Sequence, residues 1–229
     1  MNRFAIALLL VVGCTTRGPD REGAVAVTAH LALLPGADDE PWVRDISDAI
    51  HTEQLQQDEL TADGVPAPRT LPYIDVSPQP LYSDRAPPID AVRIHAGDRN
   101  ALATAFARAQ ERRGKRDDIV PLYEHGADGW QLYFAHSQQG FELAAGAMAK
   151  VVENIDEDGP TRVVTLFLAD EDAPRFEQLT REHVGRRIAL VSGDESLMFP
   201  VVREAIPGGR LQIAPGLESA DAMLARLVR

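Results

Sequence analysis

The side chains best suited to acid–base or metal chemistry are scattered along this chain. Metal centres and hydrolytic sites need converging groups, which motifs such as H-E-x-x-H, G-x-S-x-G or a phosphate-binding loop supply. The sequence contains none of these motifs. Because these motifs are absent, we expect a non-enzymatic protein with no metal and no cofactor. An envelope hydrolase is the alternative, since an acidic turn at residues 156–158 follows a predicted hairpin flanked by His125 and His136. The histidines are His30, His51, His95, His125, His136 and His183.

The single cysteine, Cys14, stands where covalent lipid attachment is expected. Arg3 precedes an apolar run at residues 4–12, which is shorter than the roughly 20 residues that a membrane-spanning helix needs and is typical of a secretory signal peptide. Small residues before the cysteine are similar to the bacterial lipobox, which predicts cleavage of residues 1–13 and lipidation of Cys14. The alternative is an ordinary signal peptide with an incidental cysteine.

The residue after the cysteine, Thr15, bears on location within the cell envelope. In lipoproteins of bacteria with two membranes, an aspartate there is associated with retention at the inner membrane. The sequence therefore predicts a protein that is anchored through its lipid to the outer membrane and faces the periplasm.

The charge balance limits the possible partners. The chain has 23 basic and 35 acidic residues and a formal net charge of −12. Such a field opposes binding to nucleic acid or to anionic lipid headgroups. With its one cysteine lipidated, the protein has no disulfide, so packing must supply its stability.

The N-terminal half is predicted to contain three segments. A tether, a strand at residues 24–34 and a helix at residues 41–55 make up a region from 14 to 63. Residues 64–90 hold seven prolines and favour extended backbone, which indicates a semi-rigid linker or a long loop; a proline-rich ligand is the alternative. These prolines are Pro66, Pro68, Pro72, Pro78, Pro80, Pro87 and Pro88.

Residues 91–140 have the pattern of a strand, a helix and a hairpin. Asp98 is the expected N-cap of the helix, and Gly114 lies at its expected C-terminus. Across residues 141–229, a helical turn, a strand pair, a helix ending at Gly185, three short strands and a closing helix follow. This order predicts an α+β fold, with helices packed on one face of an antiparallel or mixed sheet.

Residues 141–229 resemble the head subdomain of the first periplasmic domain of SecD, a membrane component of bacterial protein export. The resemblance covers residues 120–229 and is strongest over 161–216. It departs at Phe199, where the family has a small residue, and in the closing helix, which is shifted by about one residue. The segments that carry it are Val184-Gly185-Arg186-Arg187, Ile188 to Val191, Phe199-Pro200-Val201, Ile206-Pro207-Gly208-Gly209 and Ile213.

The resemblance implies contact with polypeptide on the outer side of the membrane. The transmembrane helices by which SecD couples proton flow to movement do not occur in this sequence. We therefore expect a lipid-anchored protein that binds polypeptide or envelope proteins and assists export. A structural or adaptor lipoprotein without an export role is the alternative, because a fold does not fix a function.

Binding is expected at exposed strand edges or in the groove beside the helix at residues 170–183. Strand alternation turns one residue of the pair Arg186 and Arg187 outward and the other inward. One of the two could pair with Glu182 or lie at a helix C-terminus, and the outward one could contact a carboxylate or a backbone carbonyl of a partner. The candidate partner contacts are Arg186, Arg187, Arg203 and Phe199.

Overall fold

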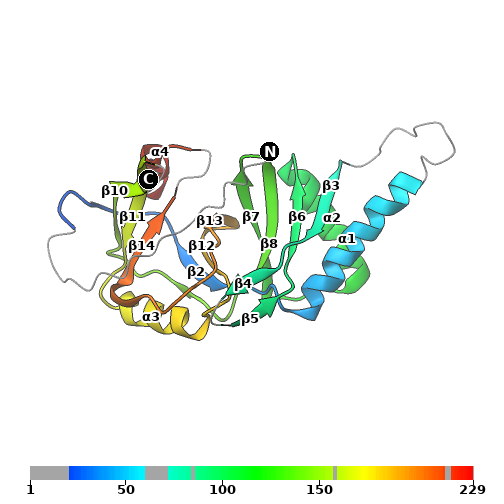
Figure 1. The fold of residues 1–229 in the computed structure, drawn as a ribbon, viewed down its shortest axis with the longest axis horizontal. Helices are drawn as coiled ribbons and strands as arrows, with labels where there is room; N and C mark the ends of the chain where they lie inside the picture. Colours follow the sequence, from blue (N-terminus) through cyan, green and yellow to red (C-terminus); the bar gives the residue numbers. More distant parts are fainter. Residues whose placement is uncertain (1–20, 60–71, 84–85, 157–158, 215–217, 229) are drawn as a thin grey trace.

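The computed structural model describes residues 21–59, 72–83, 86–156, 159–214 and 218–228. The predicted signal peptide, the lipidation site Cys14 and part of the proline-rich segment lie outside these residues. The elements form two layered units side by side, with β12, β13 and β2 between them (Figure 1). The mixed sheets and the helices packed on them confirm the predicted α+β class.

An eight-stranded sheet runs through both units. All its neighbouring strands pair antiparallel except β13 and β7, which are parallel at Glu195 and Tyr123. In spatial order its strands are β3 (Ile74–Pro78), β6 (Val92–Ala96), β8 (Gly129–His136), β7 (Ile119–Gly126), β13 (Glu195–Met198), β12 (Ile188–Ser192), β2 (Ala32–Pro35) and β9 (Phe141–Glu142).

The first unit has a core between this sheet and the helices α1 (Pro41–Glu59) and α2 (Arg99–Arg113). The rings of Trp42, Phe106 and Phe134 of β8 contact one another, with centroids 5.6 to 6.3 Å apart. The predicted N-cap is confirmed, because the carboxylate of Asp98 accepts hydrogen bonds from the backbone N–H groups of Asn100 and Ala101. These two hydrogen bonds satisfy backbone donors that have no acceptor within the helix at its start.

The second unit contains a four-stranded antiparallel sheet and two helices. Its core takes Leu33 from β2 together with Ile188 and Leu190 from β12, so the eight-stranded sheet closes it on one side. The sheet has the order β1 (Val25–Ala26), β10 (Met148–Asp156), β11 (Gly159–Phe167) and β14 (Arg210–Ile213), and its helices are α3 (Asp172–Glu182) and α4 (Ala220–Leu227).

Some expected elements differ in the structure. The single strand expected at 24–34 is two strands, β1 and β2, which belong to different sheets. Part of the proline-rich segment is β3, which pairs with β6 because Ile74 packs into the first core and Pro78 stands only at the end of the strand. The same segment contains the ribbon of β4 (Leu81–Ser83) and β5 (Ala86–Ile89).

The C-terminal half also differs from the expectation at two places. The helical turn expected from residue 141 is the short strand β9, followed by β10 from Met148. Of the strand expected at 198–205, the structure has only Met198, the last residue of β13, and an isolated bridge at Val201, because Pro200 cannot donate to a ladder.

The buried carboxylate of Asp172 fixes α3 to the segment before β10. It accepts from the backbone N–H of Ala144 at 2.6 Å and from Arg175 at 3.1 Å, and Asp172 itself has no exposed surface. The guanidinium of Arg175 also lies over the ring of Phe141 at 4.1 Å. One acid therefore orients both the helix and the chain that leads into the sheet.

Replacing Asp172 with alanine should lower the free energy of unfolding by about 2–4 kcal/mol, because it leaves a buried N–H without an acceptor. Urea unfolding followed by circular dichroism measures this. The matched control is Asp170→Ala, which removes a surface ion pair with Arg21 and should change stability by less than about 1 kcal/mol. Equal losses in the two variants would contradict the role given to Asp172.

Candidate functional site

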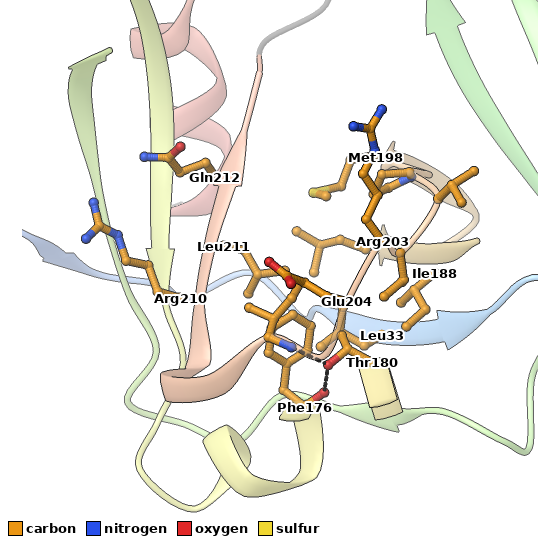
Figure 2. A pocket seen from close by; sticks show the side chains of 15 residues that line it. Leu33, Phe176, Thr180, Ile188, Met198, Arg203, Glu204, Arg210, Leu211 and Gln212 are labelled. Atoms are coloured by element: carbon orange, nitrogen blue, oxygen red, sulfur yellow. Dashed lines mark hydrogen bonds between the residues drawn. The ribbon is translucent and has the colours of Figure 1, made fainter. Parts of the chain in front are cut away.

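An apolar cavity lies beside α3, in the position of the groove expected from the sequence. Its volume is about 190 Å³. Phe176 and Leu33 lie at its inner end, and Arg203 lies at its rim (Figure 2). It is lined by Leu33, Phe176, Thr180, Ile188, Leu190, Met198, Pro200, Val201, Val202, Arg203, Glu204, Ile206, Arg210, Leu211 and Gln212.

Backbone hydrogen bonds build one wall of the cavity from residues 199–202. Ile188 donates to the carbonyl of Pro200 at 3.1 Å, and Val202 donates to the carbonyl of Arg186 at 2.8 Å. Gly185 donates to the carbonyl of Val202 at 2.8 Å. This wall is therefore held by the residues that join α3 to β12, which are the segment that carries the family resemblance.

Thr180 attaches the next part of the wall to α3. Its hydroxyl donates to the carbonyl of Phe176 at 2.9 Å and accepts from the N–H of Ile206 at 2.9 Å. Both bonds are drawn in Figure 2. A buried hydroxyl with both roles filled costs little and orients the chain that leads to β14.

Gly209 allows β14 to begin close to α3. Its φ is +61°, and a Cβ atom there would lie 2.7 Å from the Cβ of Ala173. A side chain at this position would meet both backbone strain and a clash. The Gly-Gly turn noted in the sequence therefore places the edge of the sheet against the helix.

The size and lining of the cavity favour side-chain binding over cofactor binding. Ligand pockets commonly measure about 300–1,000 Å³, whereas about 150 Å³ suffices for a benzene-sized group. The lining contains one carboxylate, Glu204, and no histidine or cysteine. In the part of the chain that the structure describes, no three metal-ligating side chains come together. A cavity of this kind can enclose one large aliphatic or aromatic side chain.

A buried charge cluster lies behind the cavity wall. Arg187 is 4% exposed, and its guanidinium lies 3.6 Å from Asp38 and donates to Gln79 at 3.1 Å. It also lies over the rings of Tyr133 and Phe199, at 5.1 and 5.4 Å from their centroids. The cluster joins β12 to residues of the first unit.

Burial sets the ionisation of the acids in this cluster. It raises the pKa of Asp38 above 3.8, although Arg187 acts in the opposite direction and Asp39 adds to the rise. Burial likewise raises the pKa of Glu124 above 4.5 against the effect of Arg187. The pKa of the Tyr133 hydroxyl is raised by burial and then by Glu124. Ionising Asp38 or Glu124 in the folded protein therefore costs more free energy than ionising it in water.

The structure separates the predicted partner contacts. Arg187 is the inward residue of the pair and is buried, so it cannot be a surface contact; its partner is Asp38 and not Glu182. Arg186 is exposed and pairs with Asp39 at 2.8 Å. Glu182 instead accepts from Gln178.

The other two predicted contacts lie on the cavity wall or beside it. Arg203 is exposed and lines the cavity. Phe199 is half-buried, with its ring centroid 4.9 Å from that of Tyr133. Partner contact by Arg186, Arg203 and Phe199 stays a prediction. Sequence reasoning missed Asp38 and Gln79, whose spacing along the chain gives no sign that they meet Arg187.

The two histidines considered for chemistry do not converge. His136 is buried with its Nε2 3.7 Å from Glu40, whereas His125 is exposed and stacks on Trp130 at 4.6 Å. They lie at opposite ends of the β7–β8 hairpin, where His136 is opposite Ile119 and His125 is opposite Trp130.

Comparison with known proteins bears on the cavity-bearing part of the chain. The family model described as "SecDF, P1 head subdomain" matches residues 133–229. The protein translocase subunit SecD of Petrotoga mobilis is 33% identical over 88 residues, and SecDF of Thermus thermophilus is 40% identical over 58 residues. Residues 133–229 form a SecD head-like domain. The cavity in this domain combines its own walls with Leu33 from β2.

The relatives are much longer than the matched region. The chain covers 18% of the length of the P. mobilis protein and 8% of the T. thermophilus protein, and the matches span 38% and 25% of this chain.

Solved SecDF structures were also found. One, described as a membrane component that enhances protein export, aligns over 86% of this chain and 91% of its own, with 18% identity and a TM-score of 0.32. A second, in a super-membrane-facing form, aligns over 90% of this chain and 29% of its own, with 17% identity and a TM-score of 0.33. None of the helices described here has the length and apolar character needed to cross a membrane.

Replacing Asp38 with asparagine should change how stability depends on pH. A carboxyl whose pKa is raised by folding binds more protons in the folded state, so stability falls as pH rises above about 3.8. Asparagine cannot ionise, and the free energy of unfolding of the variant relative to wild type should rise from about pH 4 to pH 7. Urea titrations at several pH values measure the difference.

The matched control for this prediction is Asp170→Asn, which removes a surface carboxylate outside the cluster. It leaves Asp38 and its charged neighbours Arg187 and Asp39 in place, so the fall in stability that Asp38 causes with rising pH should persist in this variant. A wild-type profile for Asp38→Asn would show that burial does not govern that acid.

Proposed function

We propose that this chain is a lipid-anchored, periplasm-facing protein that binds extended polypeptide through its SecD head-like domain and assists protein export. The domain itself is consistent with a role related to export. The observation that carries the proposal is the apolar cavity between α3 and β14, which is closed enough to bury one side chain.

The energetics suit a client that must be released. Full burial of one large apolar side chain contributes about 1.5–3 kcal/mol. Binding that rests on one such contact and a few hydrogen bonds stays near the millimolar to micromolar range, which corresponds to about 4–8 kcal/mol. A site of this strength captures a segment briefly and accepts many sequences.

The chain covers a small share of the relatives' length, so no proton-driven step is proposed for it. The role proposed here is holding polypeptide near the membrane. A structural or adaptor role without export remains the alternative. Site-specific photocrosslinking from position 203 in cells separates the two, because export predicts newly secreted chains among the products and an adaptor role predicts resident envelope proteins alone.

Introducing a charge into the cavity should weaken client binding strongly. Val201→Asp places a carboxylate in the wall, where desolvation opposes it, and should weaken binding of a permanently unfolded, fluorescently labelled protein at least tenfold. Fluorescence anisotropy measures binding. Val25→Asp is the matched control, since Val25 is 44% exposed on β1 and should leave binding unchanged. Wild-type affinity in a folded Val201→Asp variant would refute the cavity as the binding site.

Anchoring rests on the sequence around Cys14 and has its own test. Each buried lipid CH₂ contributes about 0.8 kcal/mol, and stable attachment needs more than one chain, as a lipidated cysteine provides. Cys14→Ser should therefore lose labelling by palmitate in growing cells and move to the soluble fraction. Thr15→Asp keeps the cysteine and should keep the label. Unchanged membrane association of Cys14→Ser would exclude lipid anchoring at this residue.

A further inference from the structure

We propose that the bound polypeptide adds as an antiparallel strand to the free edge of β14, inserts one large apolar side chain into the adjoining cavity, and places a carboxylate beside Arg203. This rests on the proposed function and deepens it, because it names the conformation and the chemistry of the bound segment. Three features of the described residues support it: the alternation of hydrogen-bonded positions along β14, the position of the cavity, and the positive charge of Arg203 at the rim of the cavity.

The alternation of hydrogen-bonded positions along β14 decides which of its backbone groups face the open edge of the sheet. β14 is the last strand of its sheet and pairs with β11 on one side only. Leu168 donates to the carbonyl of Gly209 at 2.8 Å, and the register then pairs Leu211 with Leu166. Since hydrogen-bonded positions alternate in an antiparallel ladder, Leu211 directs its backbone groups to β11, and the N–H and C=O of Gln212 face the open edge.

The cavity lies on the side of β14 away from β11. Figure 2 shows the side chain of Leu211 turned toward Phe176, whereas the side chains of Arg210 and Gln212 point to the other face of the strand. In an added strand, the residue opposite Leu211 projects its side chain on the same face of the sheet as Leu211, and so enters the cavity.

This arrangement fixes the backbone of the inserted residue. In antiparallel pairing, the residue opposite Leu211 occupies a position that is not hydrogen-bonded, so its N–H points away from β14. The residues before and after it direct their backbone groups toward β14. The anchor side chain and the pairing hydrogen bonds therefore belong to alternate residues of the ligand.

Charge complementarity selects an acidic residue near the anchor. Most arginines of this domain pair with carboxylates, among them Arg162 with Asp221 and Arg226 with Glu218. Arg203 has no ion-pair partner among the described residues, and Figure 2 shows its guanidinium extending away from the floor of the cavity. On a chain with a net charge of −12, this exposed cation is placed to accept a carboxylate.

A peptide series tests the strand geometry. The parent is a fluorescein-labelled nonapeptide with a central leucine, a nearby glutamate and otherwise serine and threonine. N-methylation of the leucine should change its affinity by less than about threefold, because that N–H points away from β14. N-methylation of either neighbour should weaken binding at least tenfold, because one pairing hydrogen bond and close approach are lost. Equal tolerance at all three positions would overturn strand addition.

Two variants at one position provide the matching test on the protein. Gln212→Pro removes only the N–H that faces the open edge and leaves the bonds between β11 and β14, so it should bind the peptide at least tenfold more weakly with a similar melting temperature. Gln212→Ala keeps that N–H and should bind like wild type. Wild-type affinity in a folded Gln212→Pro variant would overturn the proposal.

A charge exchange tests the carboxylate. Arg203→Glu should weaken the parent peptide several-fold and should restore affinity for a peptide in which lysine replaces the glutamate. Failure of this exchange, with the N-methyl pattern intact, would remove the carboxylate from the proposal and so overturn it as stated.

The outcomes also distinguish this proposal from the proposed function. If Val201→Asp weakens binding but N-methylation and Gln212→Pro do not, the cavity still binds polypeptide and strand addition is refuted. If Val201→Asp leaves the affinity unchanged, both the proposed function and this proposal are refuted. If sedimentation shows a wild-type dimer that Gln212→Pro dissociates, the edge is occupied by a second copy, which overturns the assignment of a client segment.

Discussion

The ion pair between Arg187 and Asp38 lies where the two cores of the protein meet. A guanidinium with 4% exposure needs compensation for its lost hydration, and this comes from Asp38, Gln79 and two aromatic rings. Removing one partner of such a pair commonly costs about 3–5 kcal/mol. These groups come from separate segments of the chain, so the pair is satisfied only when both units are in place.

The cavity depends on the same residue through the backbone. Arg187 forms an isolated bridge with Val201, and the bonds on either side of it hold the wall at residues 199–202. The guanidinium of Arg187 also lies over the ring of Phe199, the first residue of that wall. The proposed site for polypeptide and the contact between the units therefore lie on the two faces of one short stretch of chain.

Local patterns predicted much of this fold, and long-range pairing was beyond them. The N-cap Asp98, the helix beside the groove and the Gly-Gly turn before β14 were predicted because each depends on residues near in sequence. β3 was not predicted, because the prolines around it favoured a linker. Residues 74–78 form a strand because they pair with β6, which is distant in the sequence. The place of Arg187 could not be predicted because alternation distinguishes two faces of a strand without saying which one is buried.

Few backbone hydrogen bonds join the middle of the eight-stranded sheet, among them those from Tyr123 to Asp194 and from Ala37 to Phe134. β13 and β7 share one registered pair, and the bridge from Gly36 to Ala135 adds a second link. Around them, small and aliphatic residues pack across the boundary, among them Ala189 and Leu122. Surfaces that touch through packed side chains can slide by small amounts, whereas a continuous ladder must break bonds to do so. If the two halves of the sheet were displaced relative to each other, few backbone hydrogen bonds would therefore have to break at this junction, whereas the strand ladders on either side of it would stay intact.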